Sequence, residues 1–174
     1  MVAQVVDLRR VNQDSLEDLL AVAVADAAPD EVMPPVAGPP GWTAGRQEAF
    51  RDWHRARYGG LAGPLRESTF TIRYDGAVVG SARLALRDGD DVLETGMWLG
   101  RSHRGRGIGT AALRLLLAEA ARAGARAVVA DTKTHNTAAL GALRRNGATL
   151  IAGHGTAEIH AELSPPSSAP TANQ

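Results

Sequence analysis

Cysteine is absent from the 174-residue chain. This absence excludes disulfide bonds and thiolate metal sites, and for an acyl-transfer enzyme it also excludes a cysteinyl-acyl intermediate. Any acyl transfer would therefore have to be direct. The five histidines show no spacing that suggests a metal site, so we expect no bound metal.

The chain also lacks a charge excess, because nineteen Lys and Arg residues balance nineteen Asp and Glu residues. Neutralised phosphates supply most of the affinity in general nucleic-acid binding, and a chain with a net charge of zero is poorly suited to that role. We therefore expect no nucleic-acid partner.

Long apolar runs are missing as well, and the first ten residues, MVAQVVDLRR, lack the regions of a signal peptide. We expect a cytoplasmic, soluble protein without a membrane partner. With 174 residues, of which 44% are hydrophobic, the chain is long enough for one well-buried domain and too short for two ordinary ones. We place this domain at 1–163, and the composition of 164–174 predicts a disordered tail.

What the sequence does contain is a glycine-rich turn in the stretch ETGMWLGRSHRGRGIGT, residues 94–110. The pattern is typical of a strand that leads into a loop and then into a helix. Alternating glycines permit positive φ angles and let a ligand approach the backbone, while the start of the helix offers unpaired N–H groups to an anion. A pyrophosphate is the natural ligand. The residues concerned are Arg104, Gly105, Arg106, Gly107, Ile108, Gly109 and Thr110.

Two common pyrophosphate loops fit this turn poorly. A Walker loop requires Gly-Lys-Ser/Thr, but Gly109 is followed directly by Thr110. A dinucleotide-binding turn requires G-x-G-x-x-G, and here Thr110 stands where the third glycine would fall. Asp131 lies at about the distance at which an acidic residue binds the ribose in that fold, so this interpretation stays open.

Periodicity and turn signals predict an α/β fold. Asp75-Gly76 indicates a two-residue hairpin, and a strand reached through a helix should lie parallel to the strand before that helix. The expected strands are 2–8, 68–74, 77–86, 92–99, 125–131, 148–151 and 156–163. The expected helices run from Asp14, with Glu17 completing its capping box, to Pro29; from about Thr43 to Tyr58; from Ile108 to Gly124; and from Asn136 to Gly147.

The spacing Arg104-x-x-Gly107-x-Gly109, the helix between Asn136 and Gly147, and the order of elements resemble the GCN5-related N-acetyltransferase (GNAT) family over about 2–163. The resemblance implies a mixed sheet of about seven strands with splayed parallel central strands and four flanking helices. It also implies acetyl-CoA as the co-substrate.

By this resemblance, Met97 and Leu99 would offer backbone groups to the pantetheine amides, and the glycine turn would bind the pyrophosphate. Asn136 would contact the pantetheine or a water beside the thioester. The full set of residues that we assign to acetyl-CoA comprises Met97, Trp98, Leu99, Arg104, Gly105, Arg106, Gly107, Ile108, Gly109, Thr110 and Asn136.

The sequence departs from the family pattern at Leu143, where many members carry a tyrosine that protonates the departing thiolate. The simplest general acid is therefore missing. Glu94-x-Gly96-x-Trp98-Leu99 and the tyrosine-free last helix resemble the branch related to ribosomal-protein N-terminal acetyltransferases, which also includes antibiotic-modifying members.

Attack on a thioester requires a neutral amine, so a general base is needed. We predict that this base is Glu94, because burial would raise its pKa; the alternative is a solvated strand residue. Asp131 is a second candidate acid, or else a cap at the end of a strand. His135 and His160 are weaker candidates.

Acidic residues around the gap suggest a cationic small-molecule amine as acceptor, for which we assign Glu31, Trp42, Trp53, Glu94 and Asp131 to substrate binding. An aminoglycoside antibiotic of the kasugamycin type is our first interpretation, with a role in resistance or self-protection. A proline-rich loop, 29–42, either packs on the core or forms a wall of the acceptor pocket, and its five prolines exclude a helix.

Other interpretations stay open. One is a protein N-terminal acetyltransferase of the ribosomal-protein type, and another is a coenzyme A-binding module without turnover. An enzyme that acetylates charged tRNA is disfavoured by the missing basic excess. A homodimer is compatible with the sequence.

Overall fold

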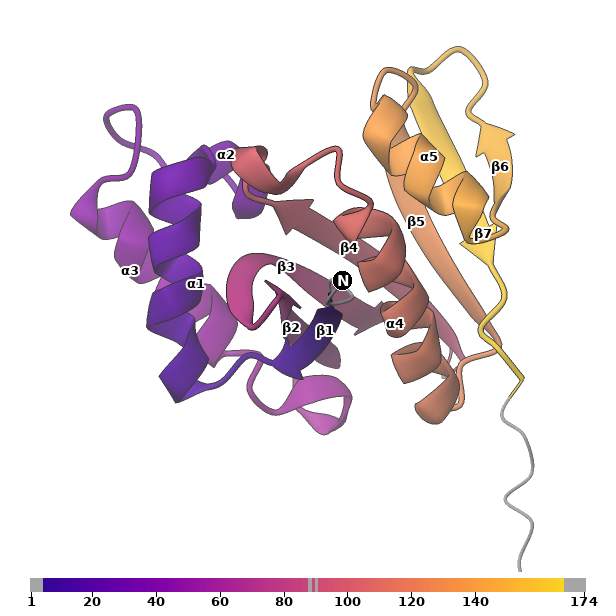
Figure 1. Cartoon of the computed structure of the whole chain (residues 1–174), viewed down its shortest axis with the longest axis horizontal. Helices are drawn as coiled ribbons and strands as arrows, with labels where there is room; N and C mark the ends of the chain where they lie inside the picture. Colours follow the sequence, from indigo (N-terminus) through magenta and orange to yellow (C-terminus); the bar gives the residue numbers. More distant parts are fainter. Residues whose placement is uncertain (1–4, 88, 90, 168–174) are drawn as a thin grey trace, which may run out of the picture.

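The computed structural model describes residues 5–87, 89 and 91–167, which fold around one mixed sheet (Figure 1). The strands are β1 (Val6–Arg10), β2 (Glu67–Tyr74), β3 (Ala77–Leu86), β4 (Val92–Leu99), β5 (Ala127–Lys133), β6 (Thr149–Ala152) and β7 (Glu158–Leu163). The helices are α1 (Gln13–Asp26), α2 (Pro29–Val32), α3 (Ala44–Arg55), α4 (Ile108–Arg122) and α5 (Thr137–Arg145), with 3-10 turns η1 (Gly60–Ala62) and η2 (Arg101–His103).

The seven strands lie in the order β1-β2-β3-β4-β5-β7-β6. The β4–β5 pair is parallel and the other neighbouring pairs are antiparallel, as predicted from the helix that separates these two strands. The predicted hairpin between β2 and β3 is also confirmed, because Asp75 and Gly76 both have positive φ angles, 49° and 84°.

Helices cover the two faces of the sheet unequally (Figure 1). The larger core packs α4 against one face, with Ile72, Leu84 and Leu93 among its fully buried side chains. A second core packs α1 and α3 against the other face, around Leu16, Leu19 and Phe50. Side chains alternate along β4, so Met97 joins the first core and Trp98 the second.

The first strand and helix differ from the prediction. The strand runs from Val6 to Arg10 rather than over 2–8, of which residues 2–4 lie outside the described part. The helix is capped by Asn12, whose side chain accepts from the N–H of Ser15 at 3.0 Å, while Ser15 Oγ accepts from the N–H of Asn12 at 3.1 Å. The predicted capping box of Asp14 and Glu17 is therefore wrong. The chain leaves the sheet at the buried Val11, so the helix can begin directly after it.

The prediction that no helix forms within 29–42 is wrong for its first residues, since Pro29–Val32 is one helical turn. Proline is tolerated at the first helical position because its missing N–H would be unpaired there. Glu31 completes the turn by accepting a hydrogen bond from the N–H of Ala28 at 2.6 Å. The rest of the loop is held by Arg46, which donates to the carbonyls of Val36, Gly38, Pro39 and Gly41.

Smaller differences concern element ends. The third helix stops at Arg55, three residues before the predicted Tyr58, and β5 runs over Ala127–Lys133 instead of 125–131. Of the predicted tail, 168–174 lies outside the described residues. No helix in the described part of the chain is long and apolar enough to cross a bilayer.

Candidate active site

The centre of the sheet opens between β4 and β5. The two strands pair at Val92↔Ala127, Leu93↔Val128 and Glu94↔Val129. Both strands continue beyond these positions, to Leu99 and Lys133, without a further pair (Figure 1). The predicted splaying of the central parallel strands is therefore confirmed.

Backbone groups of β4 face this gap. The N–H of Gly100 donates to the carbonyl of Val79 at 2.9 Å, and hydrogen bonds to a neighbouring antiparallel strand recur at every second residue. The backbone groups of Thr95, Met97 and Leu99 therefore point away from β3 and toward the gap. Buried or half-buried amides need partners, and an extended ligand with its own amides can supply them.

A cavity of about 180 Å³ lies in the gap and is lined by β4, β5, α4 and α5. Asn136 lines it and caps α5, accepting a hydrogen bond from the N–H of Ala139 at 3.1 Å. Leu143 lines it too and is 5% exposed, so the position of the expected tyrosine presents only methyl groups. Its lining comprises Thr95, Gly96, Met97, Leu113, Ala130, Asp131, Thr132, Asn136, Ala139, Ala142 and Leu143.

The glycine turn lies at the start of α4 and fits an anion. Gly105 and Gly107 have φ angles of +74° and +78°, and a β-carbon at either position would meet no atom within 4 Å. The requirement for glycine there is conformational, and the space in front of the backbone is open. Gly109 differs from the prediction, because it lies inside α4 and has no positive φ.

Three N–H groups at the start of α4 have no helical partner. The first intrahelical hydrogen bond joins the N–H of Ala111 to the carbonyl of Gly107, which leaves the N–H groups of Ile108, Gly109 and Thr110. Ile108 is 1% exposed, so its side chain belongs to the core and only its backbone can reach a ligand. A pyrophosphate would be held here by amides and by the helix dipole.

Glu31 orders the arginines before the turn. Its carboxylate lies 2.9 Å from Arg101 Nη2 and 3.4 Å from Arg104 Nη2. The hydrogen bond from the N–H of Ala28 and these guanidinium groups hold the pKa of Glu31 below its usual range, against the effect of burial. Arg104 Nε in turn donates to the carbonyl of Leu99 at 3.0 Å. Glu31 is thus engaged by the protein itself.

An open groove of about 1070 Å³ connects the turn with the gap. It brings together four of the predicted residues, Glu31, Arg104, Asp131 and Asn136. The groove therefore runs from Arg104, directly before the glycine turn, to Asp131 and Asn136, which also line the strand gap.

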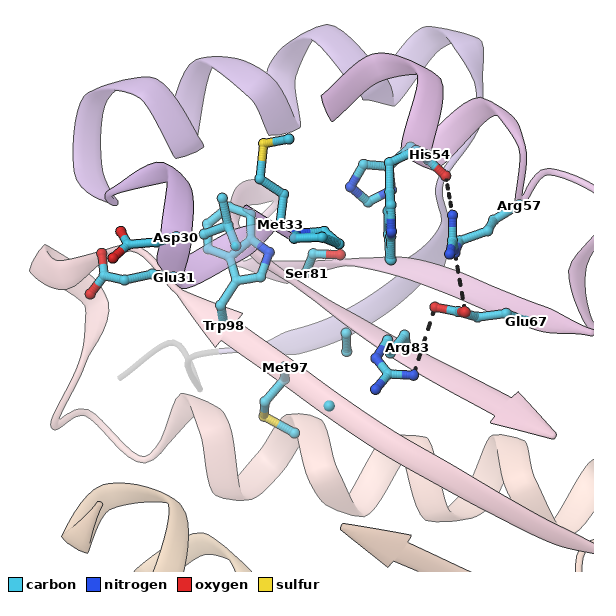
Figure 2. Close-up of a pocket in the computed structure, with 15 residues that line it drawn as sticks. Asp30, Glu31, Met33, His54, Arg57, Glu67, Ser81, Arg83, Met97 and Trp98 are labelled. Carbon is cyan, nitrogen blue, oxygen red and sulfur yellow. Dashed lines mark hydrogen bonds and ion pairs between the residues drawn. The ribbon is translucent and has the colours of Figure 1, made fainter. Parts of the chain in front are cut away.

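A second cavity, of about 430 Å³, lies on the opposite side of β4 (Figure 2). Figure 2 shows Met97 and Trp98 pointing to opposite sides of the strand. Both cavities are lined by Gly96 and Met97, so they meet at this point of β4. The lining of the second cavity comprises Asp30, Glu31, Val32, Met33, Pro34, Trp53, His54, Arg57, Glu67, Ser81, Ala82, Arg83, Gly96, Met97 and Trp98.

Glu94 is enclosed by guanidinium groups. Arg83 Nη2 and Arg87 Nη2 both contact its carboxylate, whose side chain is 15% exposed. The carboxylate of Glu94 is therefore engaged by two guanidinium groups of the protein itself. Arg83 also lies 3.8 Å from Glu67, and Glu67 lies 3.1 Å from Arg57.

Asp131 lies where β5 no longer pairs with β4, and it contacts His160 of β7. His160 Nδ1 is 2.8 Å from Asp131 Oδ1, and Arg87 Nη2 is 3.6 Å from the other carboxylate oxygen. The side chains of Asp131 and His160 are 60% and 45% exposed. A histidine held through one ring nitrogen by a carboxylate keeps its other nitrogen for a proton transfer.

The two predicted tryptophans have different surroundings. Trp42 does not line the second cavity; its Nε1 donates to the carbonyl of Ala27 at 2.9 Å and its ring lies edge-on to Phe50 at 5.9 Å. Its loop therefore packs on the core. Trp53 lines the cavity, and the guanidinium of Arg57 lies over its ring at 3.7 Å.

Sequence reasoning counted Glu67 among the acidic residues near the gap but did not assign His54 and Arg83 to the site. His54 is 1% exposed, and burial, followed by the charge of Arg57, lowers its pKa to about 3. It follows the buried Phe50 by four residues, a helical spacing that could have indicated its burial. In the described part of the chain, no group of three or more His, Asp or Glu residues could hold a metal ion.

Comparison with known proteins identifies the family and the fold of the chain. A model of the acetyltransferase (GNAT) family matches residues 30–148. RimL, a ribosomal L7/L12 alpha-N-protein acetyltransferase solved with coenzyme A, is 18% identical with a TM-score of 0.72, covering 91% of this chain and 93% of that one. Mycobacterium smegmatis RimJ, solved with CoA-disulfide, is 21% identical with a TM-score of 0.72, covering 91% and 81%.

A third structure, the putative acetyltransferase yncA from Salmonella typhimurium with acetyl-CoA, is 20% identical with a TM-score of 0.65, covering 97% of this chain and 99% of that one. No curated protein sequence matches the chain. At these identities the structural likeness shows the fold alone, and the predicted α/β fold with its seven-stranded mixed sheet is confirmed.

Proposed function

The chain belongs to the GNAT family of acetyl-CoA-dependent N-acetyltransferases, and we propose that it acetylates a primary amine of a small molecule held in the 430 Å³ cavity beside Trp98. The observation that carries the proposal is the meeting of two cavities at Gly96 and Met97. One cavity lies in the strand gap, and the other opens on the opposite side of β4.

The residues fit acetyl-CoA, which supplies an activated thioester when it is bound. We assign the pyrophosphate to the N–H groups of the glycine turn and of Ile108, Gly109 and Thr110, and the pantetheine amides to Met97 and Leu99. Arg104 is positioned beside the turn by Glu31, while Arg106 is exposed and contributes charge. Trp98 contributes its backbone position on β4, with its ring on the acceptor side.

The pair of Asp131 and His160 suits the role of general base better than Glu94 does. Both Arg83 and Arg87 contact the carboxylate of Glu94, so it is already engaged by the protein and less available to an acceptor amine. Asp131 Oδ1 can accept Nδ1–H of His160, which leaves a lone pair on Nε2. His160 does not line the 430 Å³ cavity, so Nε2 would take a proton from the ammonium of the acceptor through water. Glu94 then orders Arg83 and Arg87.

The thiolate would leave without a protein acid at the position of Leu143, which lines the gap. Asn136 Oδ1 is occupied as the cap of α5, so its amide N–H groups are what remains for a water or the pantetheine. A thiol is acidic enough that water near Asn136 suffices as the proton source.

The charges at the acceptor site argue for a compact amine rather than a polycation. Glu31, Glu67, Glu94 and Asp131 each have an arginine partner, so the acidic excess that suggested a polycationic acceptor is largely neutralised. An aminoglycoside of the kasugamycin type is a narrower hypothesis within the class of small amines. Trp42 is unsuited to contact it, because its loop packs on the core.

A second candidate is acetylation of a protein N-terminus, as the names of RimL and RimJ describe for those proteins. The cavity has Met33, Pro34 and Trp53 in its lining, and a peptide would have to continue past these residues, for example into the neighbouring hollow that Met33 and Pro34 also line.

The two candidates can be separated by one assay. The protein is mixed with acetyl-CoA and with small amines, kasugamycin and a peptide with a free N-terminus, and the release of free thiol is followed. Release with small amines supports the proposal, and release with the peptide alone supports the second candidate. Binding of coenzyme A without release in any mixture would indicate a binding module.

A further inference from the structure

Three buried polar atoms of residues that line the acceptor cavity lack a hydrogen-bond partner among the described residues: His54 Nε2, Glu67 Oε1 and Arg57 Nε. Arg57 Nε lies 3.1 Å from Glu67 Oε2 in an ion pair, which leaves the other two atoms for a ligand. His54 is 1% exposed and Glu67 is 8% exposed, and both line the 430 Å³ cavity (Figure 2). Buried polar atoms in native proteins are nearly always paired, so two in one cavity indicate a ligand group.

The remaining polar atoms of these side chains are held by the protein. His54 Nδ1 lies 3.4 Å from Thr69 Oγ1, and Glu67 Oε2 lies 3.1 Å from Arg57 Nε. Arg83 Nη1 is 3.8 Å from Glu67 Oε1, which is an ion-pair distance but too long for a hydrogen bond. Each side chain is thus fixed at one atom, and the second atom, which is buried and unpartnered among the described residues, belongs to a residue that lines the cavity.

The chemistry of the two atoms selects a hydroxyl group. A carboxylate oxygen only accepts hydrogen bonds, whereas a neutral histidine nitrogen donates or accepts according to its tautomer. Burial keeps His54 neutral, since its pKa is lowered to about 3. A hydroxyl both donates and accepts, so it can donate to Glu67 and can pair with either tautomer of His54. A ligand carboxylate would be repelled by Glu67, and an alkyl group would leave both atoms unpaired.

We propose that the acceptor is an amino alcohol, such as an amino sugar, whose hydroxyl groups bind Glu67 Oε1 and His54 Nε2 while its amine lies near Gly96 and Met97. The inference rests on the proposed function. The rings of Trp53 and Trp98 line the same cavity and provide apolar surface for the carbon skeleton of such a molecule. Specificity would then come from two buried polar atoms that only the hydroxyl-bearing amine satisfies.

The test compares trans-2-aminocyclohexanol with cyclohexylamine, two amines that differ by one hydroxyl. We expect kcat/KM for thiol release to be at least about ten times higher for the amino alcohol. In His54→Phe, which keeps an aromatic ring and removes Nε2, the ratio should fall to about one to three. Tyr58→Phe is the matched control, because its buried hydroxyl also lacks a partner but does not line this cavity; it should keep the wild-type ratio.

Equal kcat/KM for both amines in the wild type, or an unchanged ratio in folded His54→Phe, would overturn the inference. A higher kcat/KM for a matched diamine than for the amino alcohol would also overturn it, because the cavity would then bind a second ammonium group rather than a hydroxyl. Should His54→Phe fail to fold, Glu67→Met, which removes both carboxylate oxygens, provides the same comparison. Absence of thiol release with every amine would count against the proposed function, and the subsite would then be tested by crystals soaked in aminocyclohexanol, where an empty cavity contradicts it.

Discussion

Asp26, the last residue of α1, accepts hydrogen bonds from both the backbone N–H and the hydroxyl of Ser102, at 3.1 and 2.5 Å. Ser102 belongs to η2, the short turn that precedes the glycine loop. Helix α1, on one face of the sheet, therefore holds η2 in place. The glycine turn that we assign to pyrophosphate follows η2 and leads into α4 on the other face.

Asp26→Ala is expected to weaken acetyl-CoA binding. Two hydrogen bonds to Ser102 are lost, so the turn is less ordered before binding, and the dissociation constant should rise about 5- to 20-fold, or about 1–2 kcal/mol. Isothermal titration with coenzyme A measures this directly. Asp18→Ala on the same helix is exposed and should leave the affinity unchanged; equal losses in both variants would mean that α1 as a whole was disturbed.

Gly107→Ala should reduce both stability and affinity. Alanine at φ +78° costs about 1–2 kcal/mol, and rotating the backbone out of this region would turn the N–H groups away from the ligand. Gly124 has φ +80° at the other end of α4, so Gly124→Ala should lower the melting temperature similarly while coenzyme A affinity stays at the wild-type value. Comparable affinities for the two variants would contradict a role of the turn in binding.

Asp131→Asn should lower kcat by about 10²-fold near neutral pH, because Asn no longer favours the tautomer with a lone pair on His160 Nε2. The deficit should shrink as the pH approaches the pKa of the amine, about 10.4, where a base is no longer needed. Initial rates between pH 7 and 10 provide the measurement. Glu158→Gln, on the neighbouring strand, loses an ion pair with Lys133 and serves as the control. A deficit that does not change with pH would indicate a structural role.

His54 should make the protein less stable in mild acid. Its pKa is lowered from 6.5 to about 3, so between these values the unfolded chain binds a proton that the folded chain does not. The free energy of unfolding should therefore decrease as the pH falls below 6.5, by up to about 1.4 kcal/mol per unit. Urea unfolding between pH 7 and 4.5 should show this slope in the wild type and a flatter one in His54→Phe.

The choice of pH range separates His54 from the acidic residues. Asp26 and Glu31 have pKa values below their usual 3.8 and 4.5, so their contribution to stability is present above those values and is lost at lower pH. Above pH 4.5 the expected slope belongs mainly to His54. Identical slopes in wild type and His54→Phe would show that another group binds the proton.

Local signals predicted the parts of the fold that depend on neighbouring residues. Asn136 caps α5 through its side chain, Gly147 follows that helix with φ +80°, and Asp75-Gly76 forms the hairpin, as predicted. In each case the residue type and the backbone angle are linked by short-range sterics and hydrogen bonding. Asn12 was missed because Asn12 and Asp14 are equally good N-cap residues by type. The choice between them depends on the burial of Val11, which lies between the first strand and Asn12.

The surroundings of Glu94 depend on strand register and could not be predicted from residue types. Glu94 lies opposite Ala85 on β3, which places Arg83 and Arg87 as diagonal neighbours on the same face. A shift of one residue would have turned both arginines away and left the carboxylate exposed to the acceptor. The sequence thus predicted an acidic residue at the gap, while its arginine partners depend on the register between β3 and β4.

The meeting of the two cavities at Gly96 and Met97 has a kinetic consequence. If the donor and the acceptor bind as proposed, they approach from opposite sides of one strand, and neither would obstruct the entrance of the other. We therefore predict that both reactants are bound together before any bond changes and that either can bind first. Initial-velocity lines that intersect would agree with it, and parallel lines would require an acylated side chain that a cysteine-free chain is poorly equipped to form.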